Sequence, residues 1–299
     1  MRYYTSNNTL FIRGSFRAAS TGISKGVRCV TTLLNHTFPA GVDAADPERA
    51  LDAVIAKNGL ERNYLGLTTA VPPGQTCVHQ YDFVTVFISA DIRRKHPDEG
   101  GSINIIIVST QGMEDAALLE AIMVAAEAKA EALQGMDLPV TGIPRDAIIA
   151  ACEGMDNACH HSSGRDTEAG RRIREAVLHG IPEAVRRHDN GVQSFRPAFF
   201  IFSRFKGEHW VEWTMENCPY YPCHFKGQSC DYCYCPFYPC HDESLGEWAE
   251  SSGGGRVWNC ARCLLLHEPE VAAYLKKFPG ASRQELMQLA IKQKRELKS

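Results

Sequence analysis

The chain lacks the features that mark membrane proteins, secreted proteins and proteins that bind nucleic acid. Its 299 residues contain no apolar run near the roughly 20 residues that cross a bilayer, and the first residues hold no apolar stretch of signal-peptide length. The net charge is -3 and the isoelectric point is about 6.4, so no basic excess attracts phosphates or anionic membranes. We therefore expect a cytoplasmic protein with neither a membrane nor a nucleic acid as partner.

Common motifs of hydrolases and nucleotide-binding proteins are missing as well. There is no G-x-S-x-G elbow, no H-E-x-x-H pair and no glycine-rich phosphate loop. The composition, with 44% hydrophobic and 22% charged residues, is that of an ordinary globular protein. The length is compatible with two domains, because domains usually hold about 100–200 residues.

Apolar runs and helical patterns alternate through the first two thirds of the chain. The sequence predicts buried strands at 26–34, 83–92 and 103–109 and helices at 46–59, 113–133 and 167–188. The last of these helices is expected to break at Gly180 and Pro182. This alternation predicts an α/β fold, a mixed sheet covered by helices.

Eight of the twelve cysteines cluster in the last third of the chain. They are Cys218, Cys223, Cys230, Cys233, Cys235, Cys240, Cys260 and Cys263. Because thiolate ligands are favoured over disulfides in a reducing cytosol, and two pairs have the C-x2-C form, we interpret them as metal ligands. A segment rich in aromatic residues after position 195 marks the change, so we expect domains at 1–196 and 207–299.

Eight thiolates suit two tetrahedral zinc sites, with His224, His241 and His267 as possible substitutes. An iron–sulfur centre takes the same ligands and is the alternative, followed by disulfides or free thiols. Fewer than about 100 residues with few large aliphatic side chains make a poor core. The metal is therefore expected to stabilise a small cysteine-rich domain rather than to catalyse a reaction.

Polar residues follow predicted strands of the first domain at Asn35-His36 and Thr68-Thr69, and a polar loop runs from Thr141 to Asp146. Ligand clefts of α/β proteins lie at strand ends, so these residues are candidates for a site. Strand-end hydrogen bonding and capping are the alternative interpretation of the same residues. Spacing alone identifies no catalytic motif among them.

Several segments, taken in order, resemble the adenosylcobinamide amidohydrolase family. They are AASTGISKGVRCVTTLLNHTFP, GLTTAV, INIIIVSTQGMEDAALLEAIMVAAEAKAEAL, VTGIPRDAIIAACEG and DTEAGRRIREAV, within residues 9–190. The segment FKGEHWVEWTMENCPYYPCHFKGQSCDYCYCPFYPC is similar to a separate cysteine-rich small domain. The resemblance implies hydrolysis of the amide that joins the aminopropanol arm to the corrin ring, giving adenosylcobyric acid in cobamide salvage.

The resemblance also suggests roles for individual residues. Amide hydrolysis needs a general acid or base, for which we nominate His36, and oxyanion or amide donors, for which we nominate Asn35 and Thr69. Thr69 is also a candidate nucleophile, and Asp146 is a candidate to orient the base. Thr68, Thr141 and Gly142 are the expected substrate-binding residues.

A loop, a helix pair and a histidine pair also bear on this scheme. The family usually shows a T-G-T-x-T-D loop, whereas this chain has Ile143, Pro144 and Arg145 between Gly142 and Asp146. Glu127 and Lys129 match a family E-A-K pattern, but their spacing is also that of a solvent-facing helix pair, and they are left out of the predicted site. The pair His160-His161 is interpreted as surface.

Two functions from other classes remain open from the sequence. One is a corrinoid- or partner-binding protein without catalysis, in which the metal module is a docking surface. The other is electron transfer from an iron–sulfur centre to a corrinoid cobalt. Colour separates the last of these, because zinc proteins are colourless and iron–sulfur proteins are brown.

Overall fold

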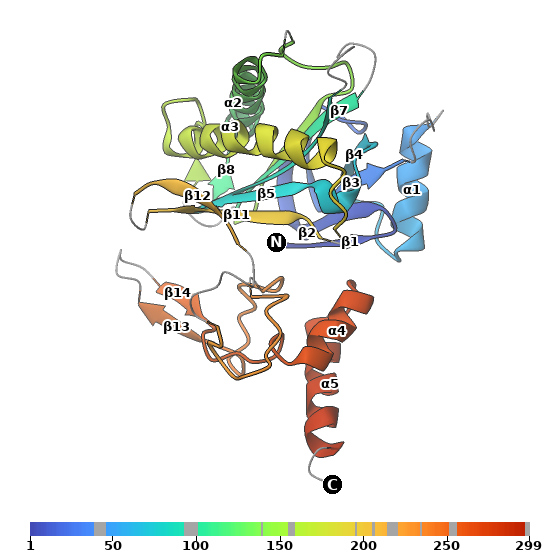
Figure 1. Ribbon diagram of the computed structural model, residues 1–299, viewed down its shortest axis with the longest axis vertical. Helices are drawn as coiled ribbons and strands as arrows, with labels where there is room; N and C mark the ends of the chain where they lie inside the picture. The colour runs from blue at the N-terminus through green and yellow to red at the C-terminus, as the bar shows by residue number, and fades with distance from the viewer. Residues whose placement is uncertain are drawn as a thin grey trace. The chain divides into compact units, whose positions relative to one another are not determined.

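The computed structural model describes residues 1–38, 46–92, 101–138, 140–154, 159–194, 196–204, 207–213, 221–233, 235–250 and 256–296 (Figure 1). Its contacts divide the chain into two compact units. The larger unit is Tyr3–Trp213, and the smaller one combines Met1–Arg2 with Thr214–Ser299. Each unit is described by itself.

The larger unit is built on a mixed sheet of ten strands. Its order is β12-β11-β5-β6-β7-β9-β2-β3-β4, with β1 paired to β2. The strands are β1 (Arg2–Ser6), β2 (Thr9–Ser20), β3 (Gly26–Thr37), β4 (Tyr64–Thr69), β5 (Cys77–Tyr81), β6 (Val84–Ile92), β7 (Gly101–Ser109), β9 (Ala147–Cys152), β11 (Ala198–Ser203) and β12 (His209–Glu212). β8 (Gly112–Met113) and β10 (Cys159–His160) form a separate parallel pair.

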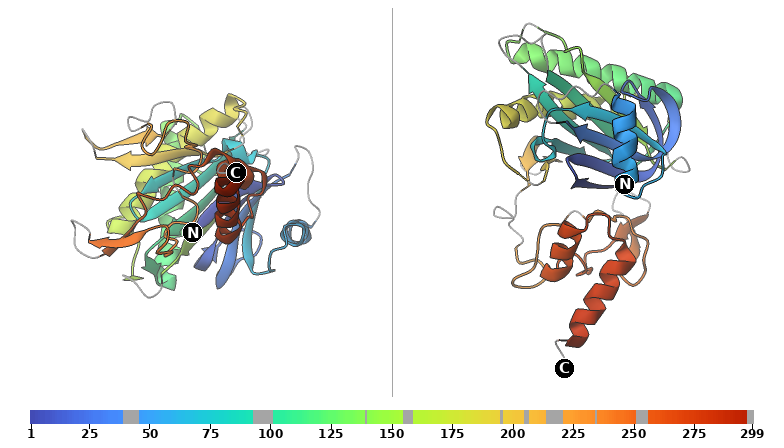
Figure 2. Two further views of the ribbon diagram at one scale, coloured as in Figure 1. Left: turned by 90° about the horizontal axis from the view of Figure 1, so that it is seen from below. Right: turned by 90° about the vertical axis from the view of Figure 1, so that its right-hand side faces the viewer.

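Two long helices cover one face of this sheet, as Figures 1 and 2 show. They are α2 (Asp115–Gly135) and α3 (Glu168–Asp189). Alternate residues of β6 and β7, among them Ile88 and Ile105, pack with buried Ala and Val residues of both helices. β6 and β7 are buried on both faces, as expected for apolar, β-branched strands at the centre of a sheet. The predicted α/β fold, a mixed sheet covered by helices, is thus confirmed.

The first helix, α1 (Pro47–Lys57), packs on β3 and β4 through Leu51 and Ile55. The side chain of Asp46 accepts a hydrogen bond from the Arg49 amide at 3.0 Å, and Pro47 occupies the first helical position. The helix predicted at 46–59 is therefore confirmed, and it begins with a side-chain cap and a proline.

The predicted break in the third helix is wrong, because α3 continues through Pro182. Gly180 is buried where a Cβ atom would lie 2.4 Å from the Ile88 side chain and 3.1 Å from the His79 ring. This close approach holds the helix against β5 and β6. Packing along the buried face of α3 therefore outweighs the local cost of an internal proline.

The face of the sheet opposite α2 and α3 closes on itself. Asn35 of β3 donates a hydrogen bond to Ser89 of β6 at 2.8 Å, although three strands separate β3 from β6 in the sheet order. The sheet must therefore curve until these strands face each other. The interior also holds fully buried apolar side chains next to these residues along the same strands, such as Leu33 and Phe87.

The smaller unit contains a hairpin and two helices: β13 (Glu247–Glu250), β14 (Arg256–Asn259), α4 (Pro269–Lys277) and α5 (Arg283–Glu296). Its buried apolar cluster is small: Leu265, Leu266, Val271, Leu275, Ala281 and Leu286. A capping box opens α5, because Ser282 donates to the Glu285 carboxylate and accepts from the Glu285 amide. Arg2 adds a bond to the Ala281 carbonyl at 3.0 Å and lies over the Phe237 ring.

The strands also show where the aromatic-rich segment belongs. β11 pairs with β5, and β12 pairs with β11, so both lie in the large sheet. The sequence-based boundary instead placed residues from 207 onward with the cysteines. The difference arises because alternate aromatic residues of this segment, such as Phe200 and Trp210, pack on the large sheet.

Among the described residues, no helix combines the length and the apolar character needed to cross a membrane.

His79 of β5 is a fully buried histidine beneath α3. Its Nε2 lies 2.9 Å from His179 Nδ1, and its ring stacks on Phe200 at 4.6 Å. Its Nδ1 has no hydrogen-bond partner among the residues that the structure describes. Burial lowers the pKa of His79 to about 3, with the neighbouring His179 adding to the shift.

We predict that His79 makes the larger unit sensitive to acid. The folded protein holds His79 neutral down to about pH 3, whereas an unfolded chain protonates it below about pH 6.5. Stability is therefore lost as the pH falls through this window, by about 1.4 kcal/mol per pH unit. Urea unfolding between pH 7 and 4 should show a shallower pH dependence for His79→Gln than for the wild type. Exposed His209 is the control, and an equal change in His209→Gln would contradict the assignment.

Candidate functional site

Buried polar side chains meet inside the curved sheet at one end of its strands. Asn35 donates to Ser89 and accepts from Asn104 Nδ2 at 2.9 Å, while Asn104 also donates to the Thr68 carbonyl at 2.9 Å. Asn35, Ser89 and Asn104 are each at most 6% exposed. Asn104 Oδ1 is buried without a hydrogen-bond partner among the described residues.

Two hydroxyl groups extend this network toward the end of β4. Thr69 Oγ1 and Ser102 Oγ lie 2.8 Å apart, and both residues are buried. Thr69 Oγ1 also accepts a hydrogen bond from the Val71 amide at 3.1 Å. A hydroxyl held by two neighbours in this way has a fixed direction, which is what a nucleophile or an oxyanion donor needs.

A buried ion pair closes the same end of the sheet. The Lys129 ammonium on α2 contacts the Asp146 carboxylate, and the two side chains are 10% and 11% exposed. Asp146 also accepts from the Ile103 amide at 2.8 Å and the Ile143 amide at 2.9 Å. A Cβ atom at Gly142 would lie 2.7 Å from Lys129 Nζ and 2.9 Å from Asp146 Oδ2, so a larger residue there would have to displace the ion pair.

We call these residues together the strand-end cluster. Its members are Asn35, Thr69, Ser89, Ser102, Asn104, Lys129 and Asp146. The structure therefore joins Asn35 with Ser89 and Asn104, and Thr69 with Ser102, on the inner face of the curved sheet. The Lys129–Asp146 pair, with Gly142 beside it, lies at the same end of the sheet, where α2 covers the opposite face. Thr68 contributes its carbonyl, whereas Thr141 is exposed.

His36 is not brought into the strand-end cluster. Successive side chains of a strand point to opposite faces, so His36 points away from Asn35. Its Nδ1 lies 2.7 Å from Thr9 Oγ1, and its ring contacts Phe38 edge-on at 4.8 Å. Burial lowers the pKa of His36, which favours the neutral ring. In register it lies opposite Thr68 of β4, on the face that Asn35 and Thr69 do not share.

Sequence reasoning missed Lys129, Asn104, Ser102 and Ser89. Lys129 was set aside as a solvent-facing residue, yet it follows buried Ala125 and Ala128 on the covered face of α2, whereas Glu127 is exposed. The signal for Asn104 is a single amide within the apolar run 103–108. A polar side chain at a position where both faces are buried needs a partner inside the protein.

A further charged group lies near the same ends of β5 and β6. His188 Nε2 is 3.2 Å from the Asp91 carboxylate, and its Nδ1 is 2.8 Å from Gln75 Oε1. The hydrogen bond to Asp91 raises the pKa of His188. Asp91 pairs in register with Ser102 of the strand-end cluster.

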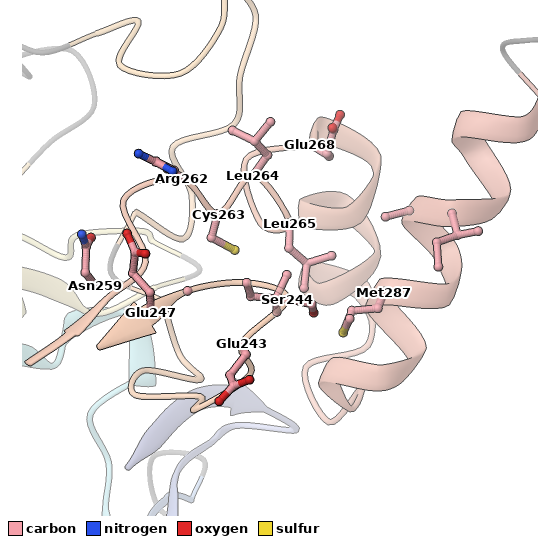
Figure 3. Close-up of a pocket in the computed structure, with 14 residues that line it drawn as sticks. Glu243, Ser244, Glu247, Asn259, Arg262, Cys263, Leu264, Leu265, Glu268 and Met287 are labelled. Carbon is pink, nitrogen blue, oxygen red and sulfur yellow. The ribbon is translucent and has the colours of Figure 1, made fainter. Parts of the chain in front are cut away.

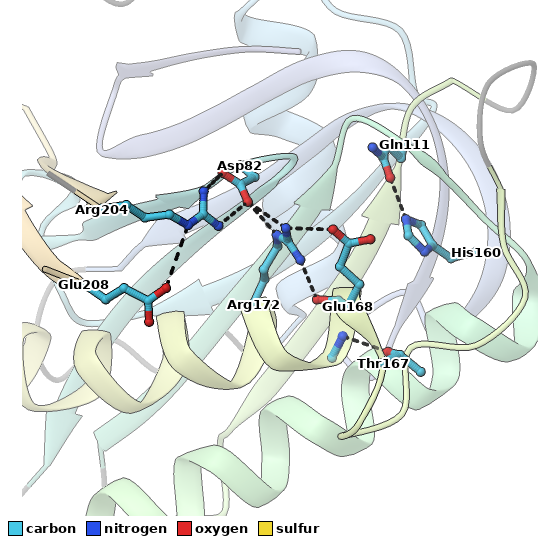
Figure 4. Close-up of polar contacts among 9 residues, drawn as sticks. Asp82, Gln111, His160, Thr167, Glu168, Arg172, Arg204 and Glu208 are labelled. Carbon is cyan, nitrogen blue, oxygen red and sulfur yellow. Dashed lines mark hydrogen bonds and ion pairs between the residues drawn. The ribbon is translucent and has the colours of Figure 1, made fainter. Parts of the chain in front are cut away.

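A second polar network occupies the opposite ends of β5, β6 and β7 (Figure 4). Asp82 accepts hydrogen bonds from Arg172 at 2.7 Å and Arg204 at 2.9 Å, and these bonds, that to Arg204 foremost, lower its pKa. His160 bonds to Gln111 Oε1 at 2.7 Å and stacks on Phe83. Each of these groups is paired within the protein, so we interpret this network as structural.

The cysteines of the smaller unit line a buried cavity of about 70 Å³. The described thiols around it belong to Cys233, Cys235, Cys240, Cys260 and Cys263, and His267 and Arg283 also line it. Burial raises the pKa of the Cys235 thiol to about 12, with Cys263, Cys260 and Cys240 adding to the shift. Cys218 lies outside the described residues.

The remaining described cysteines of this unit, Cys223 and Cys230, share one donor. Gln228 Nε2 lies 3.2 Å from Cys223 Sγ and 3.3 Å from Cys230 Sγ. His267 Nδ1 donates to the Ser229 carbonyl at 2.9 Å, which leaves a lone pair on Nε2. In the described part of the chain, no three His, Cys, Asp or Glu side chains already surround one point as metal ligands.

A larger groove of about 540 Å³ lies on the same unit (Figure 3). Leu264, Leu265 and Met287 form its apolar lining, and Glu243 and Glu247 are among its acidic residues. Its residues include no histidine and one cysteine, Cys263, among those that the structure describes. This composition does not suit amide hydrolysis or metal binding.

Comparison with known proteins identifies relatives of both parts. A family model described as "Adenosylcobinamide amidohydrolase" matches residues 2–192, and one described as "Cysteine-rich small domain" matches residues 209–290. The chain is 35% identical over 191 residues to the adenosylcobinamide amidohydrolase of Methanosarcina mazei, covering 60% of this chain and 96% of that protein. It is 37% identical over 110 residues to the protein of the same name from Halobacterium salinarum, covering 35% of this chain and 45% of that protein.

A third relative carries a different name. Over 66 residues, the chain is 42% identical to a probable cobalt-factor III C(17)-methyltransferase of Methanothermobacter thermautotrophicus. This match covers 22% of this chain and 18% of that protein. It therefore concerns a segment rather than the whole of either chain.

We predict that Lys129→Met destabilises the larger unit by about 3–5 kcal/mol, because it leaves the Asp146 carboxylate buried without its cation. The double variant Lys129→Met/Asp146→Asn should recover part of this loss. Glu127→Gln, two residues away on the exposed face of α2, should change stability by less than about 0.5 kcal/mol. Chemical unfolding measures all three, and a loss for Lys129→Met no larger than that for Glu127→Gln would show that the ion pair does not matter.

Proposed function

This chain belongs to the adenosylcobinamide amidohydrolase family, and we propose that the strand-end cluster is the site where it hydrolyses its substrate. The reaction adds water to the amide that joins the aminopropanol arm to the corrin ring. Its products are adenosylcobyric acid, which returns to cobamide synthesis, and free aminopropanol. The substrate is a corrinoid small molecule.

The observation that supports this placement is a concentration of polar groups inside an otherwise apolar curl of sheet. Burying amides and hydroxyls costs free energy even when each is hydrogen-bonded, and apolar side chains would fill the space more favourably. Such an arrangement is typical of a functional site. Asn35, Thr69 and Ser89 stand near the carboxyl ends of β3, β4 and β6, and the carboxyl ends of strands are where ligand clefts of α/β proteins usually lie.

The cluster contains the groups that amide hydrolysis needs. The Thr69–Ser102 hydroxyl pair supplies a candidate nucleophile, or a group that positions the attacking water. The side-chain amides of Asn35 and Asn104 are the candidates for orienting the substrate amide and its developing oxyanion. Their present bonds to each other hold them in place within the cluster.

We assign proton transfer to the Lys129–Asp146 pair rather than to His36. Lys129 is the cation of the cluster, and Asp146 fixes it through the bonds to the Ile103 and Ile143 amides. Lys129 reaches this end of the sheet from α2, on the face opposite Asn35 and Thr69. The substrate amide would therefore have to lie at the end of the sheet for this ammonium to stabilise its carbonyl oxygen and supply a proton to the leaving amine. His36 lies on the other face of β3 and contacts Thr9 instead.

The loop that departs from the family pattern lies beside this pair. Ile143 is 6% exposed and packs in the apolar core beneath α2 and α3, so its side chain offers no hydroxyl to a substrate. Its amide nevertheless donates to Asp146. The loop thus positions Asp146 through a backbone contact, and Thr141 and Gly142 remain the candidates there for contact with substrate.

For the smaller unit we propose two structural zinc sites built from its cysteines. The chemistry of the donors fits: thiols and histidine nitrogens are the ligands that zinc prefers in structural sites, and five thiols line one buried cavity. The buried apolar cluster is too small to stabilise the unit without such support. An iron–sulfur centre with the same ligands is the alternative.

We predict a large difference between two adjacent threonines of β4. Thr69→Ala removes a hydroxyl of the cluster and should lower the rate of hydrolysis about 100-fold or more. Thr68→Ala removes a side chain that points to the other face and should leave the rate within a few-fold of the wild type. Release of aminopropanol from adenosylcobinamide, followed by mass spectrometry, measures both. Equal rates for both folded variants would contradict the proposed site.

We also predict that the purified chain is colourless and contains zinc. Removal of the zinc with a chelator should unfold the smaller unit, because metal binding and folding are coupled in small metal-stabilised domains. Circular dichroism and hydrogen exchange of the full chain would detect this loss. A brown protein containing iron would support the alternative centre instead.

A further inference from the structure

The cysteines of the smaller unit have two different surroundings. Five of them line the cavity of about 70 Å³, and four of these five form what we call the tetrathiol group: Cys235, Cys240, Cys260 and Cys263. Cys223 and Cys230 are not among the described residues that line this cavity, and both accept a hydrogen bond from Gln228. A structural zinc ion takes four ligands, so one ion cannot use all of these thiols.

We propose that the tetrathiol group holds one zinc ion as four thiolates, and that Cys223 and Cys230 serve a separate ion. This inference rests on the zinc binding proposed above and adds which thiols share an ion. It pairs Cys260 and Cys263 with cysteines that precede them by about 25 residues. The chain segments 235–240 and 260–263 are thereby joined through one metal ion.

Local turns direct the members of the tetrathiol group toward the same space. The Cys263 amide donates to the Cys260 carbonyl at 2.9 Å, which closes the C-x2-C turn. The Tyr238 amide donates to the Cys235 carbonyl at 3.1 Å and folds the segment before Cys240 in a similar way. The four thiols do not yet surround one point in the described structure, so binding would draw them inward around the ion.

The walls of the cavity suit a charged zinc centre. Leu265, Leu266 and Trp258 are at most 8% exposed and shield the cavity from water. Four thiolates around Zn²⁺ leave two negative charges in excess, which a nearby cation stabilises. Arg283 lines the cavity and donates to the Cys240 carbonyl at 2.7 Å.

Gln228 marks the second site. It is 5% exposed, and its Oε1 accepts hydrogen bonds from the His224 amide at 2.8 Å and the Phe225 amide at 3.1 Å. This fixes its side-chain amide so that Nε2 donates toward Cys223 and Cys230. Hydrogen bonds from N–H groups to sulfur are typical of metal-bound thiolates, whose negative charge they stabilise.

Cys233 lines the cavity but is assigned to the second site. Its amide donates to the Cys230 carbonyl at 3.2 Å, which closes the C-x2-C turn that links it to Cys230. The tetrathiol group already supplies four ligands without it. Cys233 is also exposed, unlike Cys235, Cys240, Cys260 and Cys263.

The test compares two double variants of the full chain by metal analysis after zinc loading. Cys260→Ser/Cys263→Ser removes two ligands of one proposed ion, so the chain should keep about one of about two zinc ions. Cys223→Ser/Cys263→Ser removes a ligand from each proposed site and should weaken the retention of both. The exposed Cys29 of the larger unit is the control, and Cys29→Ser should bind as much zinc as the wild type.

Three outcomes are decisive. Loss of all zinc from Cys260→Ser/Cys263→Ser, or equal behaviour of the two double variants, would overturn the partition while leaving zinc binding itself intact. A wild-type chain that binds no zinc would instead contradict the zinc-binding proposal on which the inference rests.

Because the variants could unfold the unit, cadmium NMR of the wild type is the second measurement. The partition requires two resonances, one of them from an ion with four sulfur ligands, and a single resonance overturns it.

Discussion

The larger unit depends on a sheet that curves until its two halves face each other. Three strands lie between β3 and β6 in the sheet order, yet their side chains are joined through Asn35 and Ser89. Buried polar groups are tolerated when they find partners, and here the partners lie on strands that only the curvature brings together. The hydrogen bonds of the strand-end cluster and the curvature of the sheet therefore stabilise each other.

The sequence identified those members of the candidate site that a local change in residue type indicates. Asn35, Thr69 and Asp146 stand beside apolar runs, where a change from apolar to polar residues indicates a strand end. Lys129 and Asn104 stand inside a helix and a strand, and their partners come from distant segments. No pattern along the chain reports such pairs. His36 illustrates the opposite case, because adjacency to Asn35 in sequence places it on the other face of the strand.

The α/β fold itself followed from alternating apolar runs and helical patterns, and the first helix was predicted at its observed place. The continuous α3 and the strands β11 and β12 did not follow, since both depend on packing against the sheet rather than on local preference. The smaller unit shows a different balance. Its buried apolar cluster is small and its cysteines are many. Its sequence is therefore marked by thiol side chains rather than by residues that form an apolar core.

Asn35 and His36 point to opposite faces of the sheet, and this limits how the length of β3 can change during evolution. Deleting one residue upstream within the strand would exchange the two side chains, placing an imidazole inside the curl and an amide on the face that α1 covers. Deleting two residues would restore the facing while shortening the strand. Viable changes in the length of β3 are therefore expected in steps of two, whereas its side chains can be replaced one at a time.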